Sequence, residues 1–257
     1  MMGLGGWDLV LLAGFALLAG FIDAVAGGGG LIQVPGLFAV LPQETPARIF
    51  GTNKLASVFG TANATWRYAR RLTLPWDVAL PAAAMAFAFS FGGAAVVDWL
   101  PKEVVRPVVL GLLVLVILHT LWQRDFGKVQ GVRPEAGVEW RRALMVGAVM
   151  GFYDGFFGPG AGSFLIFAFV RFFGMDFLHA SSTAKVVNLA TNAAALAYFA
   201  PTGNVIWLVG GIMAVAHVVG AQIGARTALR HGSGFVRWVF VVVASVLAVK
   251  FGIDTFR

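Results

Sequence analysis

The sequence contains no cysteine and few charged residues, and each shortage excludes a class of protein. Without cysteine there is no disulfide, no cysteine-based metal site and no thiol catalysis. Charged residues make up 12% of the chain, whereas a soluble domain carries roughly 25%. So few charges do not cover the surface of a soluble globule of 257 residues, and a hydrophobic content of 59% excludes a disordered chain. A polytopic membrane protein is the class that remains.

Sequence motifs of several common enzyme classes are also missing. The chain has no GxSxG, HExxH or Walker A pattern. We therefore predict that it is not an enzyme, binds no cofactor or metal, and is no ATP-driven pump by itself. The first residues, 1–6, lack the basic region of a signal peptide, so we expect the first apolar segment to remain as a membrane helix.

Long apolar segments predict the membrane-spanning helices. Neither Val78 to Val97 nor Val186 to Ala225 contains Asp, Glu, Lys or Arg. A spanning helix needs about 20 mostly apolar residues. We expect such helices at 7–26, 47–69, 75–97, 103–122, 140–157, 179–200, 204–228 and 234–254. Two shorter apolar segments, near 30–41 and 161–174, do not reach across a bilayer and predict broken or re-entrant helices.

The second half of the chain matches the first when the two are aligned without gaps. In this repeat alignment Asp23 falls on Asp154, and Lys54 falls on Lys185. These rarer residue types favour an internal duplication over a chance match of a biased composition. We predict a first transmembrane repeat at 1–122, a basic cytoplasmic linker at 123–139 and a second transmembrane repeat at 140–257.

Basic residues predict how the two repeats lie in the membrane. The net charge is +7, and clusters of Lys and Arg between apolar runs are typical of cytoplasmic loops rather than of a nucleic-acid interface. The clusters that orient the repeats are Arg67, Arg70 and Arg71 in the first and Arg226, Arg230 and Arg237 in the second. Placing all of them in the cytoplasm gives the repeats opposite orientations and puts both termini outside it. The predicted fold is therefore all-α and polytopic, with two inverted-topology repeats of about five helical elements each, as in secondary transporters.

Two glycine-rich segments predict a binding site. Residues 27–30 are consecutive glycines, and the matching segment contains Gly158, Pro159 and Gly160. Such segments interrupt a helix, and the N-terminus of the helix that follows attracts anions. The candidate substrate-binding residues here are Gly28, Gly29, Gly30, Gly160, Gly162 and Ser163. The alternative is that the glycines serve close helix packing.

Polar residues inside the expected helices supply further candidates. Lys54 and Lys185 lie within apolar surroundings, where a charged side chain is costly and usually faces the interior of the bundle. The remaining candidate substrate-binding residues are Thr52, Asn53, Thr183 and Asn188. The alternative for the lysines is that each extends its ammonium group to the membrane surface.

Three ionisable residues have open roles. Asp23 and Asp154 precede the glycine-rich segments and either carry a proton during transport or pair with the lysines. His217 lies in an uncharged segment and is either a proton relay or a packing residue.

These motifs resemble the TauE/SafE sulfite-exporter family. The resemblance rests on residues 20–23 with 27–30, on Thr52-Asn53-Lys54, on 151–163 and on 184–188. It implies a multi-pass carrier of the bacterial inner membrane that moves sulfite or another small sulfur-containing anion.

We therefore predict a secondary transporter of a small anion (sulfite, an organosulfonate or a related oxyanion) that exports its substrate and is coupled to protons. The alternatives are a passive anion channel and a carrier of a non-sulfur organic anion. The expected partners are a small anionic substrate and the lipid bilayer, with no nucleic acid; a homo-oligomer is left open.

Overall fold

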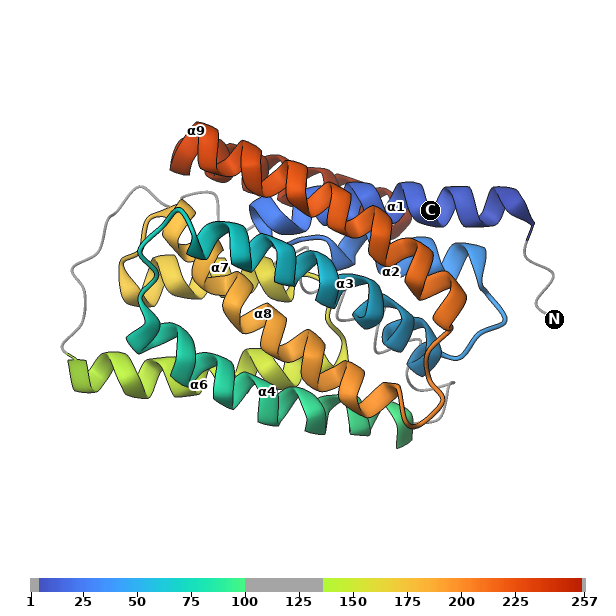
Figure 1. Cartoon of the computed structure of the whole chain (residues 1–257), viewed down its shortest axis with the longest axis horizontal. Helices are drawn as coiled ribbons and strands as arrows, with labels where there is room; N and C mark the ends of the chain where they lie inside the picture. The colour runs from blue at the N-terminus through green and yellow to red at the C-terminus, as the bar shows by residue number, and fades with distance from the viewer. Residues whose placement is uncertain (1–4, 100–135, 256–257) are drawn as a thin grey trace.

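The computed structural model describes residues 5–99 and 136–255, and this part of the chain is entirely helical and irregular, without strands (Figure 1). The expected helix at 103–122 and most of the predicted linker at 123–139 lie outside the described residues. The linker differs from the prediction at its end, because a helix already begins at Ala136.

The helices follow the expected segments closely. They are α1 (Gly6–Ala26), α2 (Gly30–Val40), α3 (Pro46–Ala69), α4 (Trp76–Trp99), α6 (Ala136–Phe156), α7 (Ala161–Phe173), α8 (Phe177–Phe199) and α9 (Trp207–Thr255). The two segments predicted to be short, α2 and α7, contain 11 and 13 residues. The two last expected helices, 204–228 and 234–254, both lie within α9, and the non-helical residue Gly232 (φ 72°, ψ −166°) separates them in the expected gap.

Local sequence explains where α3 and α8 begin. Thr45 precedes α3 and accepts a hydrogen bond from the Arg48 N–H at 3.2 Å, while Pro46 occupies the first helical position. Asp176 precedes α8 and accepts hydrogen bonds from the N–H groups of Leu178 and His179. Side chains of these types satisfy N–H groups that the helix itself leaves free.

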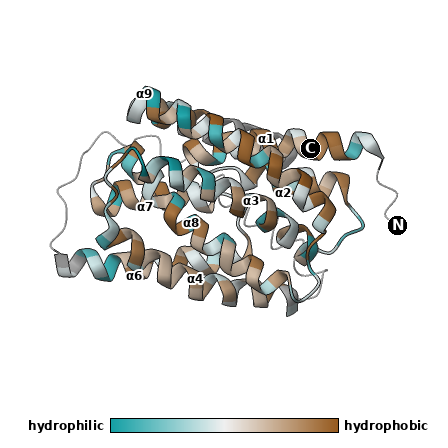
Figure 2. Cartoon of the chain, in the orientation of Figure 1, coloured by the Kyte–Doolittle hydropathy of each residue, from teal (hydrophilic) through white to brown (hydrophobic). Residues whose placement is uncertain are grey.

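Three of the described helices are long and apolar enough to cross a membrane: Gly6–Ala26, Trp76–Val97 and Trp207–Val239. Their outward-facing side chains include Trp7, Val215 and Leu208, which are 80%, 70% and 68% exposed. Such a surface suits contact with lipid rather than water. Figure 2 shows hydrophilic residues at the left-hand ends of α3 and α9 and hydrophobic residues along much of the helices between. Trp76 and Trp207, 45% and 60% exposed at the starts of α4 and α9, occupy positions typical of interfacial anchors.

The main helix contacts join the first half of the chain to the second. α1 packs against α9, α4 against α6, α3 against α9 and α4 against α8. In the repeat alignment, α1 corresponds to α6 and α4 corresponds to the beginning of α9. The α1–α9 and α4–α6 contacts are therefore equivalent, and each pairs a helix of one half with a helix of the other.

Candidate functional site

The two glycine-rich breaks lie in direct contact with each other. The N–H of Ser163 donates to the carbonyl oxygen of Gly27 at 3.1 Å. A side chain at Gly27 would meet the Gly162 backbone at 2.3 Å, and one at Gly162 would meet the Gly27 carbonyl oxygen at 2.5 Å. Gly27 also has a positive φ of 75°. Only glycine permits this approach, which brings the break between α1 and α2 onto the break between α6 and α7.

The contact differs in one respect from the expected pair of free helix N-termini. The Ser163 N–H at the start of α7 already donates to the Gly27 carbonyl oxygen. The Leu31 N–H at the start of α2 donates to the Gly28 carbonyl oxygen at 3.1 Å. These two donors are satisfied within the protein, so the lysine and asparagine side chains become the more important candidates for anion binding.

Two ion pairs cross between the halves at this contact. Lys54 Nζ on α3 lies 2.8 Å from Asp154 Oδ1 on α6. Lys185 Nζ on α8 lies 3.1 Å from Asp23 Oδ2 on α1. The two pairs are equivalent in the repeat alignment, and each joins a carboxylate of one half to an ammonium group of the other. The expected alternative of pairing between these aspartates and lysines is therefore confirmed.

Both lysines are buried. The Lys54 side chain is 2% exposed and the Lys185 side chain is not exposed at all. An ammonium group that extended to the membrane surface would be accessible, so this alternative is wrong for both residues. A buried ion pair costs desolvation energy and is poor evidence for a purely stabilising role.

A cavity of about 20 Å³ lies between the breaks and the ion pairs. Of the residues predicted for the site, it is lined by Asp23, Gly30, Asn53, Lys54, Asp154, Gly162 and Asn188. A cavity of this volume holds about one water molecule. Helical segments from both halves of the chain therefore converge on this small polar chamber.

Several polar atoms around the chamber are buried without a hydrogen-bond partner in the described part of the chain. They are Asn53 Oδ1, Asp154 Oδ2 and Asn188 Oδ1. Lys185 does not line the chamber; its Nζ reaches Asp23, which does, at ion-pair distance. Buried polar atoms are rarely left unsatisfied in folded proteins. Their concentration beside one cavity marks it as the best candidate for a polar ligand.

Other predicted site residues do not line the chamber. Thr52 donates to the Arg48 carbonyl at 2.7 Å and accepts from the Ile206 N–H at 3.0 Å. Thr183 donates to the His179 carbonyl at 2.8 Å, and Ser163 donates to the Ala26 carbonyl at 2.8 Å. These hydroxyl groups hold helices and breaks together, a role that the repeat of Thr52 and Thr183 alone did not distinguish from substrate binding.

The remaining predicted glycines surround the breaks rather than the cavity. Gly28 and Gly29 are buried, and a side chain at Gly29 would meet the Ala19 carbonyl oxygen at 2.6 Å. Gly160 has a positive φ of 81° and immediately precedes α7. Close packing, the alternative stated for the glycines, accounts for Gly29, and the positive φ favours glycine at Gly160.

Four residues line the chamber that were not among the predicted site residues: Gly27, Ser57, Gly158 and Asn192. Gly27 and Gly158 match in the repeat alignment, which was the available signal. Ser57 follows Lys54 by three residues and Asn192 follows Asn188 by four, so helical spacing places each pair on one face. Gln33 on α2 is fully buried and neither of its amide atoms has a partner among the described residues, but no motif pointed to it.

His217 on α9 is 1% exposed and lies against α3. A side chain at Gly60 would meet His217 Nδ1 at 2.1 Å, so a glycine is required there. The residue that matches His217 in the repeat alignment is Ala86. The packing role is thus visible, and a role as a proton relay stays a prediction.

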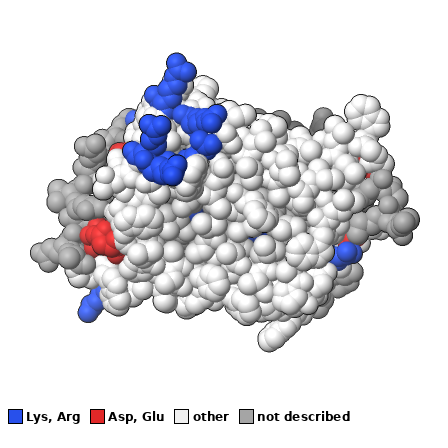
Figure 3. Space-filling model, in the orientation of Figure 1, with Lys and Arg blue, Asp and Glu red and all other residues white. Residues whose placement is uncertain are grey.

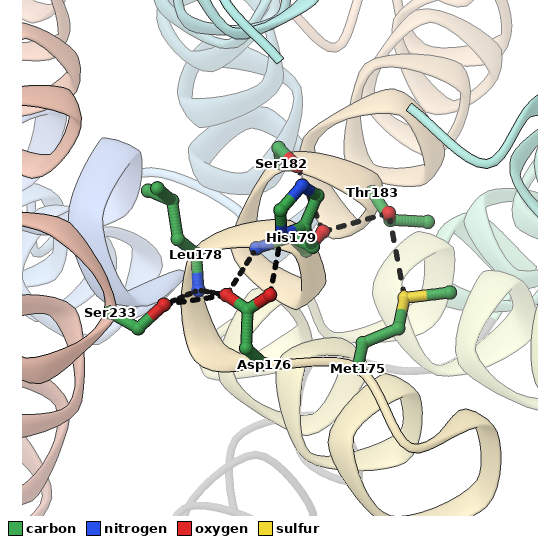
Figure 4. A network of polar contacts seen from close by, with 7 residues as sticks. All are labelled: Met175, Asp176, Leu178, His179, Ser182, Thr183 and Ser233. Carbon is green, nitrogen blue, oxygen red and sulfur yellow. Dashed lines mark hydrogen bonds and ion pairs between the residues drawn. The ribbon is translucent and has the colours of Figure 1, made fainter. Parts of the chain in front are cut away.

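A second polar network joins the α7–α8 turn to α9 (Figure 4). Asp176 Oδ1 accepts from the Ser233 hydroxyl group at 2.5 Å, and Asp176 Oδ2 lies 2.5 Å from His179 Nδ1. Burial raises the pKa of Asp176, but the hydrogen bonds from Ser233 and His179 and the His179 charge outweigh it and lower the pKa below its ordinary value of 3.8. This network lies next to Gly232 and fixes the bend in α9.

A helical membrane protein with crossed, buried ion pairs where two related halves meet is the class that the fold and the site define. The sequence profile of the family described as Sulfite exporter TauE/SafE matches residues 12–251. The chain belongs to this family.

Curated relatives agree with this assignment. The chain is 37% identical over 240 residues to the "Probable membrane transporter protein YfcA" of Escherichia coli (strain K12), covering 93% of this chain and 88% of that protein. It is 36% identical over 236 residues to the "Probable membrane transporter protein ORF9" of a Sinorhizobium species, covering 91% and 88%. A "Probable membrane transporter protein" of Haemophilus influenzae is 30% identical over 258 residues, covering 96% and 95%. Family and relatives together indicate a membrane transporter of the TauE/SafE type.

Proposed function

We propose that the protein is a secondary transporter that exports a small anion across the bacterial inner membrane, with sulfite, an organosulfonate or a related oxyanion as substrate and protons as the coupling ion. The crossed ion pairs Lys54–Asp154 and Lys185–Asp23 are the observation that carries this proposal. The family description supports a sulfur-containing anion. The bacterial origin of the relatives supports the inner membrane.

The charges of the site support coupling to protons. With both lysines protonated and both aspartates ionised, the four charges cancel. An anion that binds Lys54 competes with the Asp154 carboxylate, which lies 2.8 Å away. Protonating that carboxylate removes the competitor and restores the positive charge, so a proton and an anion bind together more favourably than either alone.

The small volume of the chamber supports a carrier over the alternative of a passive channel. Its volume of about 20 Å³ admits one water molecule but not sulfite. A chamber that must widen to hold its substrate suits alternating access. The donors around the chamber recognise an anion by charge and hydrogen bonds. They do not by themselves distinguish a sulfur-containing anion from a non-sulfur organic anion, so an experiment must decide between the two.

The course of the helices supports an inverted repeat. Figure 1 draws α1 from right to left but its counterpart α6 from left to right, and it draws α3 and α8 in opposite directions as well. In this arrangement α2 and α7 are broken or re-entrant arms, and the glycine breaks at their starts lie against each other.

Flux in proteoliposomes tests the proposal. We expect sulfite or sulfoacetate efflux that saturates with concentration and depends on a proton gradient. Lys54→Ala abolishes this flux, whereas Arg171→Ala, which removes an exposed cation from α7, leaves it intact. Flux that does not saturate and ignores the proton gradient would instead identify a channel, and unchanged flux in Lys54→Ala would remove the site from the mechanism.

A further inference from the structure

Five arginines converge on a cavity at one end of the molecule. The cavity has a volume of about 590 Å³ and lies between the end of α3 and the middle of α9. Its complete lining is Trp66, Arg67, Arg70, Arg71, Leu72, Arg226, Leu229 and Arg230. Figure 3 shows one large patch of Lys and Arg side chains on this face, at the upper left.

Among the described residues, no carboxylate pairs with these arginines. The lining contains no Asp or Glu, and none of the five arginines forms an ion pair within residues 5–99 and 136–255. Arg67 Nε donates instead to the neutral Asn63 Oδ1 at 3.1 Å. With its amide oxygen turned towards them, Gln222 accepts from Arg67 at 3.0 Å and from Arg226 at 3.1 Å. Like charges held this close repel each other, and neutral acceptors compensate only part of the cost.

The repeat shows that the cluster belongs to one end of the protein only. In the repeat alignment, Arg67, Arg70 and Arg71 correspond to Tyr198, Pro201 and Thr202. Arg226 and Arg230 correspond to Ala95 and Trp99. A general preference for cytoplasmic cations explains why this end is basic, but scattered arginines would satisfy that preference without the repulsion. Their convergence on one cavity calls for an anion.

The walls of the cavity indicate what kind of anion it accepts. Leu72, Leu229 and Trp66 bring apolar surface next to the guanidinium groups, and the Arg70 guanidinium lies over the Trp66 ring at 4.4 Å from its centroid. Guanidinium groups bind phosphate oxygens in a bidentate manner. Tryptophan beside basic residues is typical of the membrane interface, and basic pockets between helices at the cytoplasmic side bind lipid headgroups.

We infer that this arginine cavity binds the phosphodiester headgroup of an anionic phospholipid, such as phosphatidylglycerol or cardiolipin, from the cytoplasmic leaflet. The guanidinium groups hold the phosphate, and Leu72, Leu229 and Trp66 contact the glycerol and the first part of the acyl chains. The site is separate from the proposed substrate chamber and does not depend on what the protein transports.

Native mass spectrometry with purified protein in detergent tests the inference. Phosphatidylglycerol, cardiolipin and phosphatidylcholine are each titrated onto the wild type, onto Arg67→Gln/Arg226→Gln, and onto the control Arg141→Gln/Arg142→Gln. The control removes the same number of exposed cations from α6, outside the cavity. We expect the anionic lipids to bind tightly to the wild type and to the control. Losing two charge-assisted contacts of about 1.5–3 kcal/mol each reduces affinity at least tenfold in the cavity variant.

Two further arms complete the test. Circular dichroism establishes that each variant is folded. The variant Arg67→Lys/Arg226→Lys keeps the charge but not the guanidinium fork, and it should bind anionic lipid more weakly than the wild type. Inorganic phosphate, followed by thermal stability, separates a lipid from a soluble ligand. Equal loss of lipid in both double Gln variants, or stabilisation by phosphate without lipid binding, would overturn the inference.

Discussion

Breaking one crossed ion pair should destabilise the protein far more than removing the whole pair. In Lys54→Met the carboxylate of Asp154, 6% exposed in its side chain, loses its partner at 2.8 Å. Removing one member of a buried pair costs about 3–5 kcal/mol, whereas replacing both members by neutral groups is much less costly.

Thermal unfolding in detergent, followed by tryptophan fluorescence, measures the effect in wild type, Lys54→Met, Asp154→Asn and the double variant. For a chain of this size about 1 kcal/mol corresponds to 2–4 °C, so each single variant should lose about 6–20 °C at pH 7. The double variant should lose less than either single variant. A double variant that loses as much as the single variants, or more, would refute the reasoning.

Three further outcomes follow from local geometry. Gly162→Ala places a methyl group 2.5 Å from the Gly27 carbonyl oxygen and should lower the free energy of unfolding by about 1–3 kcal/mol or more. The control Gly211→Ala has open space around it and should not destabilise the protein. Equal melting temperatures for the two variants would contradict the close approach. Thr52→Val leaves the Ile206 N–H without its acceptor and should lower the free energy of unfolding by about 1–3 kcal/mol, more than the exposed control Thr227→Val does. Anion binding per folded protein should not weaken, and a loss of binding would return Thr52 to the site. Asp176 has a pKa below 3.8 in the folded protein, so its contribution is complete above that value and is lost as the pH falls through the folded pKa. The melting temperature of Asp176→Asn should be lower than that of the wild type at pH 7, and the difference should narrow as the pH falls below 3.8; a constant difference would contradict this.

Much of the fold could be predicted because composition and repetition determine it directly. Apolar runs delimit α1, α4 and the beginning of α9, and the consecutive glycines mark the break that separates α1 from the short α2. The separation of the last two helices was predictable as well, because the break at Gly232 falls in the expected gap between 228 and 234. The start of α6 at Ala136, by contrast, lies in a stretch whose charges indicated a linker.

The candidate site was predictable in its charges but not in its hydroxyl groups. Asp23, Asp154, Lys54 and Lys185 are conspicuous because charged residues are rare in this sequence, and the repeat relates them in pairs. Which aspartate pairs with which lysine depends on how the two halves pack, and the sequence does not predict it. The sequence likewise does not distinguish Thr52, which accepts from Ile206 N–H, from Asn53, which lines the chamber, since adjacent helical residues point in different directions.

Anion binding to the purified protein tests the central claim, that the crossed lysines form the substrate site, most directly. Thermal stability is measured with sulfite, sulfate, thiosulfate, sulfoacetate, taurine and acetate at several pH values, for the wild type, Lys54→Ala, Lys185→Ala and the control Arg171→Ala. A ligand at 100 times its Kd stabilises the folded state by about 2.7 kcal/mol. We predict that at least one sulfur-containing anion raises the melting temperature of the wild type and of Arg171→Ala, more strongly at lower pH, and has no effect on Lys54→Ala. A shift that persists in both lysine variants would place the anion elsewhere and contradict the account.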